Sequence, residues 1–72
     1  MKKIKKIKIK VNGIFKYVPE KYKISDLLKD LKIPLKKVAI ELNQEIIDKK
    51  NISKIVLKKD DKIEIVHFIG GG

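Results

Sequence analysis

The sequence has no cysteine and no arginine, and it has a single histidine, His67, among its 72 residues. Without cysteine, neither a disulfide framework nor a thiolate metal site can form. One histidine cannot build a metal centre by itself. The composition therefore excludes cysteine-based chemistry, and it predicts no metal site.

Long apolar runs are also absent. Met1, Lys2 and Lys3 imitate the charged start of a signal peptide, but the residues that follow alternate isoleucine with lysine. The longest apolar stretches are a few residues, whereas a membrane-spanning helix needs about 20. We therefore expect a soluble, cytoplasmic protein with no membrane partner.

The charge is strongly of one sign, with a net charge of +10 and six lysines among the first ten residues. Such a cluster, from Lys2 to Lys10, raises the possibility of a small basic module that binds nucleic acid or another polyanion. Base readout and bidentate phosphate contacts favour the arginine fork, which this chain lacks. A lysine-biased composition on solvated strand faces is the favoured interpretation, and we expect no nucleic-acid partner.

A chain of this length forms one domain, which buries about 60% of its unfolded surface. The hydrophobic fraction of 43% is spread from Ile4 to Ile69, which is enough for a core. Glycine occurs four times, and three of the four are the last three residues. We expect a folded domain over residues 1–68 and a flexible glycine tail over residues 69–72.

Alternating apolar residues predict strands. Residues 7–11 and 14–18 flank Asn12-Gly13, a strong signal for a type I′ hairpin turn, and the second strand stops at Pro19. Further strands are expected over residues 38–42, 45–47 and 62–68. Residues 49–57 look like an irregular connection with one helical turn.

One short helix is expected over residues 25–32. Ser25 can cap its start, Asp26 suits the positive end of the helix dipole, and Pro34 ends it. Leu27, Leu28 and Leu31 would share its apolar face. A single sheet that holds this helix on one face is the economical way to bury the three leucines.

These elements predict an α+β fold with one mixed sheet of four to five strands packed on one short helix. If the first and last strands lie adjacent and parallel at the centre, the fold is a β-grasp, the ubiquitin-like architecture.

Residues for conventional catalysis are few. His67 has no cysteine to act with, and Ser25 and Ser53 lie outside any nucleophile-elbow context. Asp60-Asp61 are adjacent carboxylates that suit a tight turn better than acid–base work. We interpret His67 as a surface or edge residue.

The three terminal glycines are a poor way to extend a strand, because glycine loses the most conformational entropy on ordering. They form a thin thread, and residues 69–72 span roughly 13 Å when extended. Such a thread can enter a narrow channel in another protein and present the terminal carboxylate to a remote active site. A frayed terminus or a residual linker would look similar, although a linker usually carries serine.

A carboxylate is a poor electrophile, since attack on it must expel an oxide. Conversion to an acyl adenylate supplies a good leaving group, which a sulfur nucleophile can then replace. Glycine at the reacting position leaves the carbon open to attack.

Several segments resemble, in order and spacing, the ThiS family of sulfur carrier proteins of thiamin biosynthesis, a ubiquitin-like β-grasp family. They are IKVNG at 9–13, VPE at 18–20, SDLLKDL at 25–31, VAIELNQEII at 38–47 and DKIEIVHFIGGG at 61–72. Two turns depart from the family pattern. The chain has Asn43-Gln44 where Asn-Gly is common, which suggests a different turn, and it has Lys59-Asp60-Asp61 where Asp-Gly-Asp is common.

The resemblance implies that the carboxylate of Gly72 is adenylated and converted to a thiocarboxylate, which donates sulfur for thiazole formation. Gly70 and Gly71 would be required for activation, and Val66, Phe68 and Ile69 would meet the partners. The phase of the last strand decides which sheet face Val66 and Phe68 occupy.

The partners implied are a ThiF-like, E1-like adenylyltransferase, a ThiG-like thiazole synthase and a sulfur donor protein. The chain itself would be a protein co-substrate and not an enzyme, with no bound cofactor, and the activating enzyme would consume ATP. The small subunit of molybdopterin synthase also resembles this fold and ends in Gly-Gly. That family tends to carry proline before its glycines, and VHFIGGG has none. Sulfur carriers of other pathways stay open as alternatives.

Overall fold

The computed structural model describes residues 5–68, which form a five-stranded sheet and one α-helix. The strands and the helix are β1 (Lys6–Val11), β2 (Ile14–Pro19), α1 (Ile24–Asp30), β3 (Val38–Leu42), β4 (Glu45–Ile46) and β5 (Lys62–His67). Two short 3₁₀ turns, η1 (Leu35–Lys37) and η2 (Lys49–Asn51), lie in the connections. The expected order of elements is confirmed.

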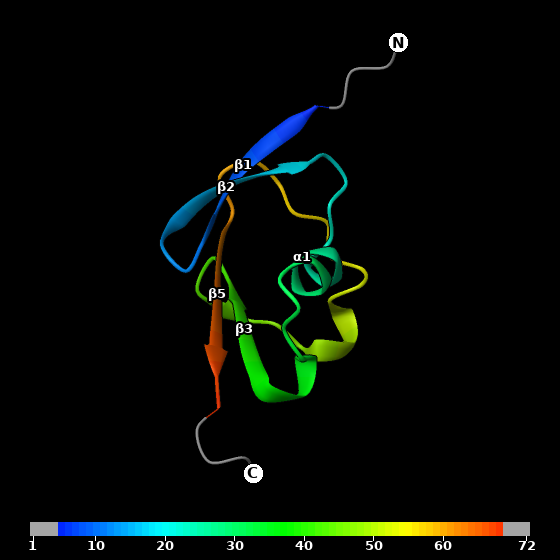
Figure 1. Ribbon diagram of the computed structural model, residues 1–72, viewed down its shortest axis with the longest axis vertical. Coiled ribbons are helices and arrows are strands. Elements are labelled where there is room, and N and C mark those ends of the chain that lie inside the picture. The colour runs from blue at the N-terminus through cyan, green and yellow to red at the C-terminus, as the bar shows by residue number, and fades with distance from the viewer. Residues whose placement is uncertain (1–4, 69–72) are drawn as a thin grey trace.

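The sheet has the order β2-β1-β5-β3-β4, with β1 and β5 parallel and the other neighbours antiparallel. The first and last strands are thus adjacent near the centre, and α1 lies across one face of the sheet (Figure 1). This is the β-grasp arrangement that the sequence predicted.

Several turns place residues other than glycine in the left-handed region, among them the two hairpin turns and the turn before β5. Asn12 and Gly13 have φ of 49° and 82°, as a type I′ hairpin requires. Asn43 and Gln44 have φ of 51° and 73°, so both central residues of the second hairpin are also left-handed. The expectation of a different turn at Gln44 is therefore wrong, because this glutamine adopts the geometry that glycine supplies elsewhere. Asp60 has φ of 69° in the turn before β5.

The helix starts earlier than predicted. Lys23 is the N-cap residue, and Ser25 lies inside the first turn without capping it. The carboxylate of Asp26 accepts a hydrogen bond of 2.9 Å from the backbone N–H of Lys23. The backbone N–H groups of Ile24 and Ser25 donate to carbonyls of the 49–57 connection, so tertiary contacts replace a serine cap.

The helix also ends earlier than predicted, and Pro34 is not its stop. Lys32 adopts φ of 56°, its N–H donates to the Lys29 carbonyl, and the N–H of Ile33 donates to the Leu28 carbonyl. These two bonds form a Schellman motif, which satisfies two of the last carbonyls of the helix. The helix therefore ends before Pro34 is reached.

The core lies between α1 and the inner sheet face. Its buried members are Ile9, Val18, Ile24, Leu27, Leu28, Val38, Ile40, Ile52, Leu57, Ile63 and Ile65. The 49–57 connection packs on the core through buried Ile52 and Leu57 and half-buried Ile55. Leu31 is 38% exposed, so its predicted place beside Leu27 and Leu28 is wrong; the helix has ended by that point.

Candidate functional site

The last strand, β5, carries Val66 and leads to Phe68, two of the predicted partner-binding residues. In β5, Ile63 and Ile65 point into the core and are 1% and 5% exposed, while Lys62, Glu64 and Val66 alternate with them on the outer face. Both isoleucines therefore pack β5 against the core. The strand runs parallel to β1 and ends at the lower end of the molecule in Figure 1.

Two neighbouring strands hold β5. It pairs with β3 through five residue pairs, from Leu42 opposite Ile63 to Val38 opposite His67. Its pairing with β1 stops at Ile63, because β1 ends there and turns into the hairpin. Beyond that point, one edge of β5 has lost its backbone partner.

The side chain of Asn12 takes the place of the missing backbone. Its Oδ1 accepts from the Ile65 N–H at 2.7 Å, and its Nδ2 donates to the Ile65 carbonyl at 3.2 Å. One amide thus satisfies both backbone groups of a residue 53 positions away in the sequence. The Asn-Gly signal predicts a turn role for Asn12 alone, and nothing in it indicates this second role.

A second asparagine fixes the start of β5. Asn43 accepts from the Lys62 N–H at 2.9 Å and donates to Oδ1 of Asp61 at 3.0 Å. The other oxygen of Asp61 accepts from the Lys58 N–H at 2.8 Å. The Asp61 carboxylate and the left-handed backbone of Asp60 therefore serve the turn before β5, as interpreted from the sequence.

Phe68 lies at the exit from the sheet. Its N–H donates to the Lys37 carbonyl at 2.9 Å, and the ammonium nitrogen of Lys49 lies 5.0 Å from its ring centroid. An exposed cation–π contact of this kind contributes about 0.5–1 kcal/mol. Contacts from η1 and η2 thus fix the point at which the chain leaves the fold.

Val66 and Phe68 both remain accessible, at 52% and 55% exposure. Val66 pairs with Ala39 on the sheet face that α1 does not cover. The structure therefore brings two of the three predicted partner-binding residues together at the end of β5. Ile69, Gly70, Gly71 and Gly72 lie outside the described residues.

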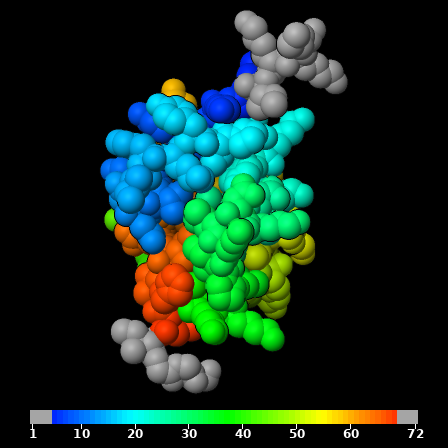
Figure 2. All heavy atoms as spheres, in the orientation of Figure 1, coloured from blue at the N-terminus to red at the C-terminus, as the bar shows by residue number. Residues whose placement is uncertain are grey.

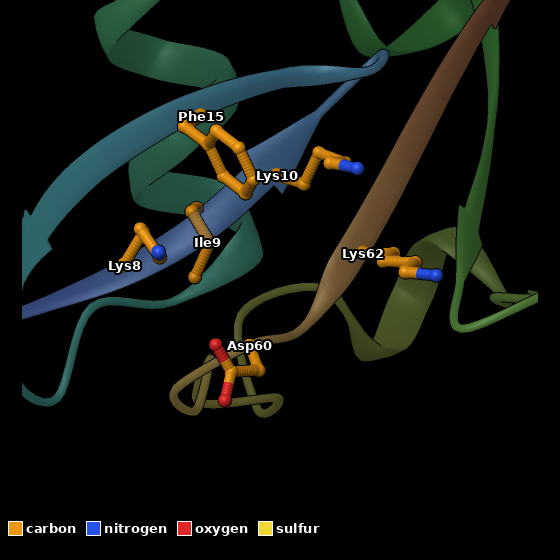
Figure 3. Close-up of a pocket in the computed structure, with 6 residues that line it drawn as sticks. All are labelled: Lys8, Ile9, Lys10, Phe15, Asp60 and Lys62. Carbon is orange, nitrogen blue, oxygen red and sulfur yellow. The ribbon is translucent and has the colours of Figure 1, made fainter.

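The same open face carries aromatic and basic side chains on β1 and β2. The ring of Phe15 lies near Lys8 and Lys10, whose ammonium nitrogens are 4.6 and 4.9 Å from its centroid (Figure 3). Lys62 and Asp60 complete the lining of a shallow hollow there. Sequence patterning placed these lysines on a solvated face and did not indicate their contact with Phe15.

Conventional catalytic groups do not converge in the described part of the chain. His67 is exposed, and residues 5–68 contain no group of three or more metal-ligating side chains. Burial of the phenol and the nearby Asp30 carboxylate raise the pKa of Tyr22 above its ordinary value. Its hydroxyl donates to that carboxylate, and the contact ties the loop before α1 to the helix.

Among the described residues, no helix is long and apolar enough to cross a membrane.

Comparisons with known proteins converge on one family. The model of the ThiS family matches residues 9–72. The sulfur carrier protein ThiS of Bacillus subtilis is 47% identical over 49 residues, which cover 68% of this chain and 74% of that protein. The crystal structure of the thiamine biosynthesis protein ThiS from Geobacter metallireducens superposes with a TM-score of 0.80 at 30% identity, covering 92% of this chain and all of that one.

Two larger relatives are also similar. Proteins named thiazole synthase from Paramagnetospirillum magneticum and Magnetococcus marinus are 36% and 38% identical over 66 residues. The match covers 92% of this chain, and the chain spans about a fifth of the length of each of these relatives.

Proposed function

The chain belongs to the ThiS family of sulfur carriers in thiamin biosynthesis, and on that premise we propose that its C-terminal Gly72 is the sulfur-carrying residue. An activating enzyme of the E1-like, ThiF-like class adenylates the Gly72 carboxylate with ATP and releases pyrophosphate. A sulfur donor protein then delivers sulfur at the oxidation level of sulfide, the carbon–sulfur bond forms at the acyl carbon as AMP leaves, and a thiocarboxylate results. The thiocarboxylate donates its sulfur to a ThiG-like thiazole synthase for thiazole formation.

One observation carries the proposal: a central strand, fixed on both sides, leads directly to the glycine end of the sequence. Asn12 and β3 hold β5 up to His67, and Lys37 holds Phe68. The next four residues are Ile69 to Gly72. A fixed strand end, followed after Ile69 by three glycines, suits delivery of a carboxylate into a partner's active site.

The open end of β5 suits partner docking. Val66 and Phe68 expose apolar surface beside the exit, and Ile69 follows them in the sequence. Exposed apolar patches on a small protein commonly mark interaction sites. We therefore assign Val66, Phe68 and Ile69 to docking of the activating enzyme and of the synthase, with Gly70 and Gly71 as the connection to the reacting residue.

The names of two relatives support thiazole synthase as the acceptor. A segment similar to this chain makes up about a fifth of each protein named thiazole synthase. In this role the chain is a co-substrate, used once per sulfur transferred, and ATP is consumed by the activating enzyme. We expect the reaction in the cytoplasm, where ATP is available.

The test is reconstituted thiazole formation with an activating enzyme, a sulfur donor and thiazole synthase of the same organism. Thiazole should form in proportion to the full chain supplied. A chain lacking Gly71 and Gly72 is the matched control and should yield none. Equal thiazole from the full and the shortened chain would overturn the proposal.

A further inference from the structure

The strand β2 forms one outer edge of the sheet and exposes large apolar side chains. Ile14, Phe15 and Tyr17 are 72%, 61% and 65% exposed. An edge strand presents backbone N–H and C=O groups that no neighbour satisfies, so a long, apolar edge is a template for another strand. In Figure 1, β2 lies far from the C-terminal end of β5.

The register tells which backbone groups face outward. The two-residue turn makes Val11 and Ile14 a hydrogen-bonded pair, and pairs then alternate along an antiparallel ladder. Phe15 and Tyr17, opposite Lys10 and Lys8, are therefore in non-hydrogen-bonded pairs. Their N–H and C=O groups point away from β1, toward the open edge.

Further along β2, the alternation of inward- and outward-facing backbone groups continues as far as Pro19, where the outward N–H is missing. The Glu20 N–H donates to the Lys5 carbonyl at 3.0 Å, in phase with the hydrogen-bonded positions. The next outward position after Tyr17 is Pro19, which has no N–H to offer. The available edge is thus short and centred on Phe15 and Tyr17.

A shallow apolar hollow lies beside this edge, on the side of the helix. It is lined by Val11, Ile14, Phe15, Lys16 and Leu31. In Figure 2 the blue hairpin lies against the green segment that contains the end of α1. The early end of the helix explains why Leu31 is free to line the hollow and not buried in the core.

The surroundings of the edge are basic. Lys16 lines the hollow, and on the other face the ammonium nitrogens of Lys8 and Lys10 lie 4.6 and 4.9 Å from the centroid of the Phe15 ring. Among the described residues, none that lines the hollow carries a carboxylate. A strand added here would pass between cations on both faces, which favours acidic side chains.

We propose that the β2 edge, from Ile14 to Tyr17, docks an extended acidic segment of another protein. The segment adds as a strand, with hydrogen bonds to the outward backbone groups of Phe15 and Tyr17. One of its apolar side chains enters the hollow, and its carboxylates meet Lys8, Lys10 and Lys16. A second copy of this chain fits less well, because two molecules of net charge +10 repel each other. This site is separate from the exposed side chains of Val66 and Phe68, and it takes no part in the proposed sulfur transfer.

The experiment titrates ¹⁵N-labelled full chain with a short, capped peptide of alternating aspartate and valine. Saturable shifts are expected at the amides from Ile14 to Tyr17 and at Leu31, with slower amide exchange at Phe15 and Tyr17. The affinity should fall as salt increases. Removal of Gly71 and Gly72 should leave it unchanged, so this test stands or fails independently of the carrier function.

Variants separate the edge from general charge effects. Ile14→Asp should weaken binding by about tenfold, because it places a like charge against the peptide. Ile46→Asp is the matched control, since Ile46 is 80% exposed at the opposite edge of the sheet, on β4, and should bind as the parent does. Tyr17→Pro should abolish binding while keeping the β1–β2 ladder, because the N–H that it removes points outward.

The proposal would be overturned by equal weakening of binding by both aspartate variants, or by chemical-shift changes centred on Val66 and Phe68 and not on β2. Absence of saturable binding would overturn it as well. Concentration-dependent pairing of β2 with a second copy, in preference to the peptide, would also contradict it.

Discussion

Asn12 has two roles at the scale of the single residue. It supplies the left-handed φ of the hairpin and clamps both backbone groups of Ile65. Replacement by glycine keeps the backbone geometry without strain and removes the clamp alone. Asn12 is therefore the residue through which the hairpin turn supports the strand that leads to the tail.

Asn12→Gly should lower the free energy of unfolding by about 1–2 kcal/mol, the contribution of two partly buried hydrogen bonds. Exchange of the Ile65 amide should become faster. The measurement is urea unfolding together with hydrogen exchange.

Gln44→Gly is the matched control, because Gln44 has φ of 73°. Relief of the left-handed strain should raise stability by about 0.5–1 kcal/mol. If both glycine variants change stability in the same direction, the clamp is not the source of the effect.

Tyr22 gives the fold a dependence on alkaline pH. Its pKa is raised by burial and by Asp30, so the folded state holds the phenolic proton more tightly than the unfolded chain, which releases it near pH 10. Below that pH both states are protonated and the full contribution is present. Above it, the unfolded chain binds fewer protons than the folded one, and stability falls as pH rises.

Tyr22→Phe should remove this part of the alkaline decline. The comparison is between the unfolding profiles of the parent and the variant, so that every other contribution to the alkaline decline is common to both. Profiles of the parent and the variant that stay parallel from neutral pH to pH 11 would contradict the assignment.

At the scale of the element, the pattern predicted the strands well because alternation reports directly which side chains are buried. Residues 38–42 match β3, and residues 7–11 and 62–68 differ from β1 and β5 by one residue at one end. The parallel pairing of β1 with β5, inferred as a condition, is present. Local alternation and the Asn-Gly signal were sufficient for these elements.

The helix was predicted less accurately because its start depends on contacts distant in sequence and its end on a local left-handed residue that no sequence signal marks. The start is set by hydrogen bonds to the connection at Ile52 and Ile55, which no local capping rule contains. The end is set by Lys32, a residue with no intrinsic preference for the left-handed region. In the candidate site, Val66 and Phe68 were predicted from the resemblance, whereas the roles of Asn12, Lys37 and Lys49 needed the fold.

The Schellman ending predicts how two substitutions differ. Lys32→Gly should stabilise the protein by about 0.5–1 kcal/mol, because glycine adopts φ of 56° without steric cost. Pro34→Ala should leave the helix end where it is, since the helix has stopped before the proline. Unfolding midpoints and backbone chemical shifts measure the two effects; a helix that lengthens in Pro34→Ala would show that proline is the stop after all.

At the scale of the whole molecule, the two proposed sites lie on different parts of the sheet. The end of β5 carries the proposed sulfur-transfer machinery, and the β2 edge carries the proposed peptide site. A chain of 72 residues accommodates both because the helix covers one sheet face alone, and the other face and one edge stay open.

Val66→Asp tests docking of the activating enzyme. It places a charge in exposed apolar surface beside the exit and should raise the concentration of carrier needed for half-maximal adenylation by about tenfold, as for loss of an interface contact worth 1–2 kcal/mol. Val56→Asp is the control, because Val56 is 41% exposed and bridges to Lys23, away from β5. Equal effects of the two variants would argue against docking at Val66.

The intact mass of the chain, after incubation with an activating enzyme, ATP and a sulfur source, tests the central claim most directly. The account predicts a gain equal to the replacement of one oxygen by sulfur, mapped by fragmentation to Gly72 and dependent on ATP. An unchanged mass in the presence of an activating enzyme of proven activity, or a gain mapped to any other residue, would contradict it.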